Sequence, residues 1–156
     1  MNLIEFSNHS IKRQNIEYFI HLVRIAMADD IISKTEMELL HRIGKKIGFT
    51  DIEIDNLIDT TGKSDYIPPT ELSKRFEQVY DIVKMTLADG VIDKNEMRLA
   101  SNFALKSDFK ENEIPHLLVL LISGIKQGKN EEELFEEYLK EKIKQDRVHN
   151  QTEKAE

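Results

Sequence analysis

The sequence repeats itself at an offset of sixty residues. Residues 19–58 align without a gap on residues 79–118. A repeat at a fixed offset indicates one supersecondary unit present twice, and such units bury their apolar faces against each other. We therefore expect two copies of one unit to share a single core. Positions with the same residue in both copies include Val23/Val83, Ala28/Ala88, Asp29/Asp89, Ile32/Ile92, Lys34/Lys94, Glu36/Glu96, Met37/Met97, Leu39/Leu99, Phe49/Phe109, Glu53/Glu113, Ile54/Ile114 and Leu57/Leu117.

Each copy carries apolar residues at the spacing of an amphipathic helix. The stripe through Phe19, Val23 and Met27, for example, recurs sixty residues later. The pattern continues through the whole chain, and predicts helices over about 11–28, 33–47, 50–59, 70–87, 94–106, 109–125 and 131–145. Residues suited to cap these helices are Ser10, Ser33, Thr50, Thr70, Asp93 and Asp108.

Two positions bear on where the helices end and begin. Gly48 follows the second helix directly, and a glycine there commonly terminates a helix. Pro115 would lie inside the sixth helix if that helix began at Phe109. Alternatively, the helix begins later and Pro115 lies in its first turn, where proline is tolerated.

These helices predict an all-α fold with about seven helices. Two pseudo-symmetric helix–turn–helix repeats, about 19–58 and 79–118, would pack into one bundle around a pseudo-two-fold axis. A chain of 156 residues is long enough to bury one such core. We expect one domain over residues 1–145, followed by a flexible charged tail over 146–156.

Composition excludes several classes of protein. The net charge of −7 argues against nucleic-acid binding, which depends on Lys and Arg. No apolar run is long enough to insert in a membrane, and the N-terminal residues do not resemble a signal peptide. The absence of cysteine excludes thiolate metal sites and fits a cytoplasmic protein. No motif of a known catalytic class occurs, and the histidines neither repeat nor form a metal-ligand pair.

The turn between the first two helices of each repeat is the densest part of the alignment. It reads ADDIISKTEM in the first copy and ADGVIDKNEM in the second. An EF-hand loop places oxygen ligands at positions 1 and 3 and glycine at position 6. With Gly90 at position 6, positions 1 and 3 are Met85 and Leu87, and the first copy has Asp30 in place of the glycine. Half of the ligands are missing, so neither turn is an EF-hand.

The doubled pattern A-D-G-x-[IV]-x-x-x-E resembles the tellurite-resistance TerB family and the related domain of some J-domain co-chaperones. Family resemblance implies an all-helical TerB-like fold, a non-catalytic role as a protein-binding or scaffold module in the bacterial stress response, and acidic residues that bind a metal. On this sequence the resemblance reaches Asp29, Glu36, Asp89 and Glu96. Asp30, which stands where the pattern has glycine, and Asp93 complete the candidate metal ligands. Oxygen ligands would favour Ca²⁺ or Mg²⁺.

Helix capping is the alternative explanation for these residues. Ser33 with Glu36, and Asp93 with Glu96, have the spacing of a capping box. Asp89, like Asp29, lies at the C-terminal end of a helix, where the helix dipole disfavours a carboxylate. It therefore needs a backbone amide, the repeated lysines Lys34 and Lys94, or a cation as a partner. A purely structural helical adaptor and, less favoured, a metal-dependent enzyme remain alternative functions.

Overall fold

The computed structural model describes residues 16–26, 33–61 and 66–154, with side chains described to residue 147. Its described residues form seven helices and no strand, which confirms the predicted all-α fold. A helix over residues 16–26 comes first. It is followed by α2 (Lys34–Lys46), α3 (Asp51–Thr61), α4 (Leu72–Thr86), α5 (Lys94–Lys106), α6 (Ile114–Lys126) and α7 (Glu131–Lys154).

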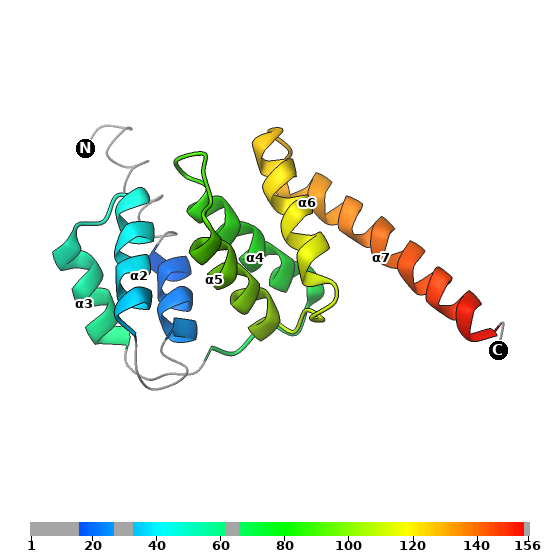
Figure 1. Cartoon of the computed structure of the whole chain (residues 1–156), viewed down its shortest axis with the longest axis horizontal. Coiled ribbons are helices and arrows are strands. Elements are labelled where there is room, and N and C mark those ends of the chain that lie inside the picture. The colour runs from blue at the N-terminus through cyan, green and yellow to red at the C-terminus, as the bar shows by residue number, and fades with distance from the viewer. Residues whose placement is uncertain (1–15, 27–32, 62–65, 155–156) are drawn as a thin grey trace.

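The helices pack in two neighbouring groups (Figure 1). The helix over 16–26, α2 and α3 lie at one end, and α4, α5 and α6 pack beside them, while α7 extends away from the bundle. Helix α4 contacts α2, α5, α6 and α7, and so lies at the centre. The largest fully buried side chains come from both groups, and include Phe19, Leu22, Leu40, Ile43, Ile54, Phe76, Ile82, Phe103, Leu117, Leu121 and Leu134.

The second helix of each repeat ends in the same way. Gly48 follows α2 with a φ of 98°, and Asp108, sixty residues later, follows α5 with a φ of 66°. The next residue in each copy is a buried phenylalanine, whose amide donates back to the helix: Phe49 N to Gly44 O at 2.9 Å and Phe109 N to Ala104 O at 3.2 Å. These are the bonds of a Schellman termination. Glycine adopts this conformation freely, and aspartate is among the few other residues that tolerate it.

Three predicted helix boundaries are wrong: the starts of α4 and α6, and the end of α7. Thr70 does not cap α4, because that helix begins at Leu72 after Glu71, which makes no side-chain capping bond. Asp108 does not cap α6, because its left-handed backbone ends α5. Helix α6 begins at Ile114 with Pro115 in its first turn, which is the later of the two starts that the sequence allowed.

The third correction concerns the C-terminal segment. Helix α7 continues to Lys154, so residues 146–154, predicted as a flexible tail, are helical. The apolar pattern ends at Ile143, so it does not predict this extension.

Some predictions fall outside the described residues. Ser10 as a cap and the carboxylates of Asp29 and Asp30 belong to segments that the structure does not describe. Pseudo-two-fold symmetry between the repeats remains a prediction. Among the described helices, none has the length and hydropathy of a membrane span.

Candidate functional site

The second acidic turn, residues 87–96, leads from α4 into α5. Asp93 accepts a hydrogen bond from the Glu96 amide at 2.8 Å, and Glu96 Oε1 accepts one from the Asp93 amide at 3.2 Å. Both bonds of the predicted capping box are therefore present. Arg42, from α2, also pairs with Asp93 at 2.9 Å. The predicted role of Glu96 as a cap is confirmed, and its burial shows that capping is not its only role.

Lys46, the last residue of α2, reaches across into this turn. Its ammonium lies 2.7 and 2.9 Å from the two carboxylate oxygens of Glu96 and 3.2 Å from Asp89 Oδ1. It also donates to two carbonyl oxygens, of Thr86 at 3.1 Å and of Val91 at 3.2 Å. An ammonium has three protons, so the five oxygens around Lys46 share three hydrogen-bond donors. The turn thus surrounds a positive charge that belongs to the other repeat.

Burial makes this pair more important than a surface ion pair. The Glu96 side chain is 2 % exposed and the Lys46 side chain 11 %. Burial by itself would lower the pKa of Lys46, but the hydrogen bonds to Glu96 and Asp89 outweigh it and raise the pKa. Lys46 therefore stays charged, and removing either partner would leave a buried charge without compensation.

Asp89 has the partner that its position at a helix end requires. Its carboxylate accepts a hydrogen bond from the Val91 amide at 3.1 Å. That bond, followed by the one from Lys46, lowers the pKa of Asp89. A backbone amide is one of the partners that the sequence left open. The lysine is Lys46, however, and not the repeated Lys94 beside the turn.

The spacing of residues within the turn does not predict the role of Lys46, which lies on another helix. The alignment does contain a signal: Lys46 corresponds to Lys106 sixty residues later, an identical pair at the far end of the second helix of each repeat. A repeated lysine at the C-terminal end of a helix is usually explained by the helix dipole. Only the packing of α2 beside α4 brings it to the carboxylates.

Glu36, the counterpart of Glu96, has a different environment. Its amide donates to the Ser33 side chain at 3.1 Å, which confirms Ser33 as the cap of α2. Glu36 is only half-buried, and it lines an open groove of about 410 Å³ between α2 and α5. Arg98 lines the same groove. Of the predicted site residues, the structure thus brings together Asp89, Asp93 and Glu96, and places Glu36 elsewhere.

His41 holds α2 and α3 together. Its Nδ1 lies 2.7 Å from Asp51 Oδ1 and its Nε2 lies 2.8 Å from Asp55 Oδ1. Two carboxylates facing both ring nitrogens favour the imidazolium, and these bonds raise the pKa of His41 although its partial burial acts in the opposite direction. No local pattern predicts this arrangement, because the two aspartates lie ten and fourteen residues from His41 and on another helix.

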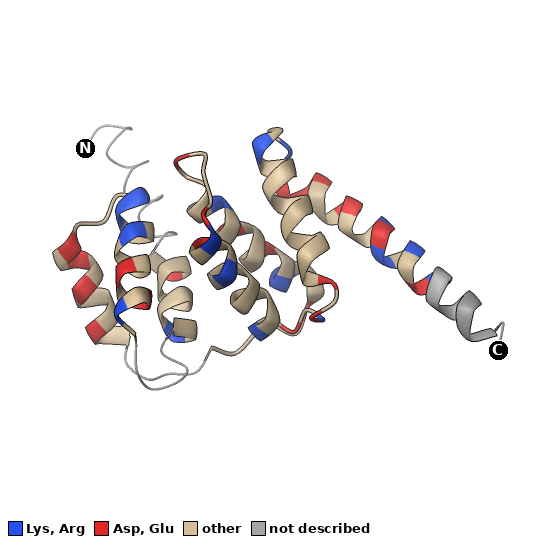
Figure 2. Cartoon of the chain, viewed as in Figure 1, with Lys and Arg blue, Asp and Glu red and all other residues tan. Residues whose placement is uncertain are grey.

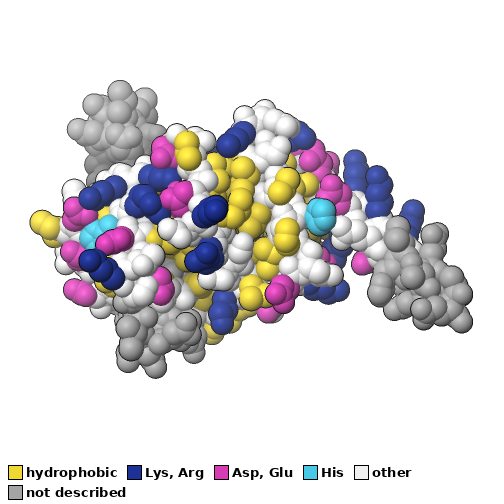
Figure 3. All heavy atoms as spheres, viewed as in Figure 1, with side chains coloured by type: hydrophobic (Ala, Val, Ile, Leu, Met, Phe, Trp, Pro, Cys, Tyr) yellow, Lys and Arg dark blue, Asp and Glu magenta, His cyan; other side chains and the backbone are white. Residues whose placement is uncertain are grey.

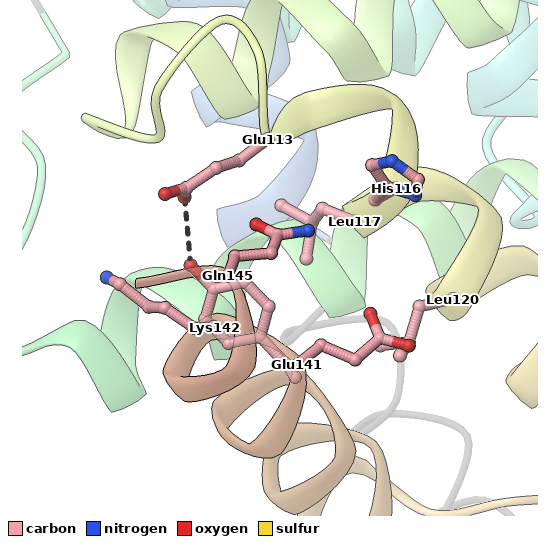
Figure 4. Close-up of a pocket in the computed structure, with 8 residues that line it drawn as sticks. Glu113, His116, Leu117, Leu120, Glu141, Lys142 and Gln145 are labelled. Carbon is pink, nitrogen blue, oxygen red and sulfur yellow. Dashed lines mark hydrogen bonds between the residues drawn. The ribbon is translucent and has the colours of Figure 1, made fainter. Parts of the chain in front are cut away.

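The described residues line several pockets, one of about 580 Å³ beside Lys46, Asp81 and Lys84. Among the described residues, no group of three or more His, Asp or Glu side chains is placed to hold a metal ion. A recess between α6 and α7, where Tyr138 donates to Glu113, is shown in Figure 4. Its volume of about 10 Å³ is enough for roughly one water molecule. It is too small to bind a substrate.

Comparisons with protein-family models, curated proteins and solved structures find no significant match to this chain. The TerB-like family remains a prediction that depends on the two acidic turns. Function has to be inferred from the chain's own surfaces.

Proposed function

We propose that this chain is a non-catalytic, TerB-like protein-binding module that works in the cytoplasm as part of a bacterial stress response. The observation that carries the binding role is an exposed apolar surface on the second half of the bundle. In Figure 3, hydrophobic side chains gather over α5 and α6. Contiguous exposed apolar patches on a folded protein commonly mark sites of interaction.

Helix α6 explains why this surface is apolar. Its sequence, IPHLLVLLISGIK, has a single charged residue, at its end. A helix that is apolar on all sides is normally buried on all sides. Here Pro115 and Val119 are exposed and Ile122 is half-buried, on one side of the helix at helical spacing. Val119 is 64 % exposed, and Leu105 on α5 is 47 % exposed. We call Leu105, Pro115, Val119 and Ile122 the α5–α6 face.

The alternatives explain less of this geometry. A purely structural adaptor has no use for an exposed apolar surface, which costs solubility. An enzyme needs titratable groups directed into a pocket. In the second turn, the groups that could serve are bonded to one another and to Lys46.

Photo-crosslinking in the cell that makes the protein tests the proposal. A photoreactive amino acid would replace Val119 on the α5–α6 face, or Asp55 on the exposed side of α3 as a control. We expect a discrete protein adduct from position 119 and none from position 55. The adduct should disappear when Leu105→Asp is added, with no change in melting temperature. Equal crosslinking from both positions, or no adduct from 119, would refute a binding role for this face.

We assign no divalent cation to the second turn, because the ammonium of Lys46 already contacts Glu96 and Asp89, and Arg42 pairs with Asp93. Ca²⁺ or Mg²⁺ binding is retained for the first turn, at Asp29, Asp30 and Glu36. Calorimetric titration of the wild type and of Asp29→Asn tests this part separately. Heat from either ion that Asp29→Asn removes supports the site, and no heat from the wild type excludes it.

A further inference from the structure

The exposed charges on α5 and α6 are opposite in sign to the net charge of the chain. The chain as a whole carries a net charge of −7. Yet the only acidic residue in these two helices is Glu96, which is buried. Their exposed charged residues are all basic: Lys94, Arg98, Lys106 and Lys126. Figure 2 shows acidic residues concentrated instead on α3 and α7.

These basic residues lie beside the apolar surface. Lys94, Arg98 and Leu105 are spaced to lie on one side of α5, and Lys126 continues the row of Pro115, Val119 and Ile122 on α6. Helices α5 and α6 pack against each other. Basic side chains therefore lie beside the α5–α6 face along α5, where Arg98 also lines the groove toward α2, and at the end of α6. The exposed acidic residues Asp108 and Glu111 lie in the connection between the two helices.

We infer that the α5–α6 face binds an amphipathic helix of a partner protein, whose apolar stripe is flanked by acidic residues. This inference deepens the proposed protein-binding function and depends on it. Both helices have 13 residues, so the face is about 20 Å long. A partner helix of three to four turns would cover it, with apolar anchors at i, i+4 and i+7 against Val119 and its neighbours. The basic border would select acidic flanks and speed association.

A second copy of the chain is the less suitable occupant. Its own acidic segments are α3, where Ile54 and Ile58 are buried and Ile52 alone is an exposed large hydrophobic residue, and the first half of α7, which begins with three glutamates. The apolar residues of that segment are already used: Leu134 is fully buried and Tyr138 is 6 % exposed. Offering them to another molecule would require α7 to leave its own bundle.

An anionic membrane is disfavoured by the kind of apolar residue on the surface. The large hydrophobic residues exposed in the described part of the chain are all aliphatic. Surfaces that enter the lipid interface typically present several Trp, Phe or Leu residues among basic ones, and the α5–α6 face has one such residue, Leu105. A partner protein helix therefore fits this face better than a lipid surface does.

The test uses the ¹⁵N-labelled full chain and two designed helical peptides of about 14 residues. Both carry leucines on one side; glutamates flank the leucines in the first peptide and lysines in the second. We expect amide shift changes confined to α5 and α6 with the glutamate peptide, and at least tenfold weaker binding of the lysine peptide. Val119→Asp and Arg98→Glu should each weaken binding of the glutamate peptide at least tenfold. The matched controls on α7, Ile143→Asp and Lys140→Glu, should not.

Each other outcome overturns the inference. No binding of the glutamate peptide, equal binding of the two peptides, or shift changes on other helices would show that the face does not select an acidic helix. Self-association in sedimentation that Val119→Asp abolishes would assign the face to a second copy. Binding to vesicles of phosphatidylcholine and phosphatidylglycerol that Val119→Asp abolishes would assign it to a membrane. If the face does not select an acidic helix, the crosslinking experiment can still show a protein partner. Failure of this inference is therefore distinguishable from failure of the proposed function.

Discussion

Replacing Glu96 by glutamine should destabilise the protein far more than the same change at Glu36. The side-chain oxygen of glutamine can still accept a hydrogen bond from the Asp93 amide, so the capping bond survives. The charge that faces Lys46 is lost, and an uncharged amide replaces one of the two carboxylate oxygens near its ammonium. Breaking a buried ion pair costs about 3–5 kcal/mol. Because Asp89 and two carbonyl oxygens still contact Lys46, we expect about 2–4 kcal/mol for Glu96→Gln.

Glu36→Gln is the matched control, because the repeat places Glu36 at the same position in the first copy. There the side chain is half-buried and Ser33 remains as the cap, so a loss below about 0.5 kcal/mol is expected. Urea unfolding followed by circular dichroism at pH 7 would measure both. The melting temperature of Glu96→Gln should fall by about 5–12 °C. Equal losses at the two positions would show that the glutamates act only as caps and that the Lys46 pair contributes nothing.

Three further predictions concern other parts of the fold. Because the pKa of His41 is raised on folding, its contribution is complete below pH 6.5 and is lost as the pH rises through the folded value. Urea unfolding between pH 5 and 9 should show this loss, of less than about 1 kcal/mol, in the wild type and not in His41→Gln. Burial first, and the nearby carboxylate of Glu77 in addition, raise the pKa of Asp81 to about 6. Folding therefore disfavours its charged form, and Asp81→Asn should stabilise by about 1–2 kcal/mol above pH 6 and give no gain below pH 4. Gly124→Ala would place a methyl group 2.1 Å from the buried Leu134, so thermal unfolding should show a loss of about 1–3 kcal/mol.

The apolar periodicity and the sixty-residue repeat were sufficient to predict the helical fold. Helix α5 has the predicted bounds, and Gly48 ends α2 as expected. The errors at the starts of α4 and α6 have a common origin, because the chain contains more residues that can cap a helix than it has helix starts. Thr70 and Asp108 both have side chains suited to capping. At Asp108 the left-handed backbone ends α5, and Pro115 lies in the first turn of α6, so these two residues decide where α6 can start.

The candidate site was predictable only in part. Local spacing was enough for the capping box of Asp93 and Glu96, because both bonds join residues three apart. The bond from Lys46 spans fifty residues, and His41 reaches its partners on another helix. Such contacts depend on how helices pack, and no local pattern contains that information.

A double-mutant cycle between Lys46 and Glu96 tests most directly whether the second turn is built around the charge of Lys46. Lys46→Met keeps the length of the apolar stem and removes the ammonium, and Glu96→Gln removes the carboxylate charge. The unfolding free energies of the wild type, both single variants and the double variant give the coupling between the two side chains. We predict a coupling free energy of about 2–3 kcal/mol, and we expect the double variant to be at least as stable as the less stable of the two single variants. Additive losses, with coupling below about 0.5 kcal/mol, would contradict the account.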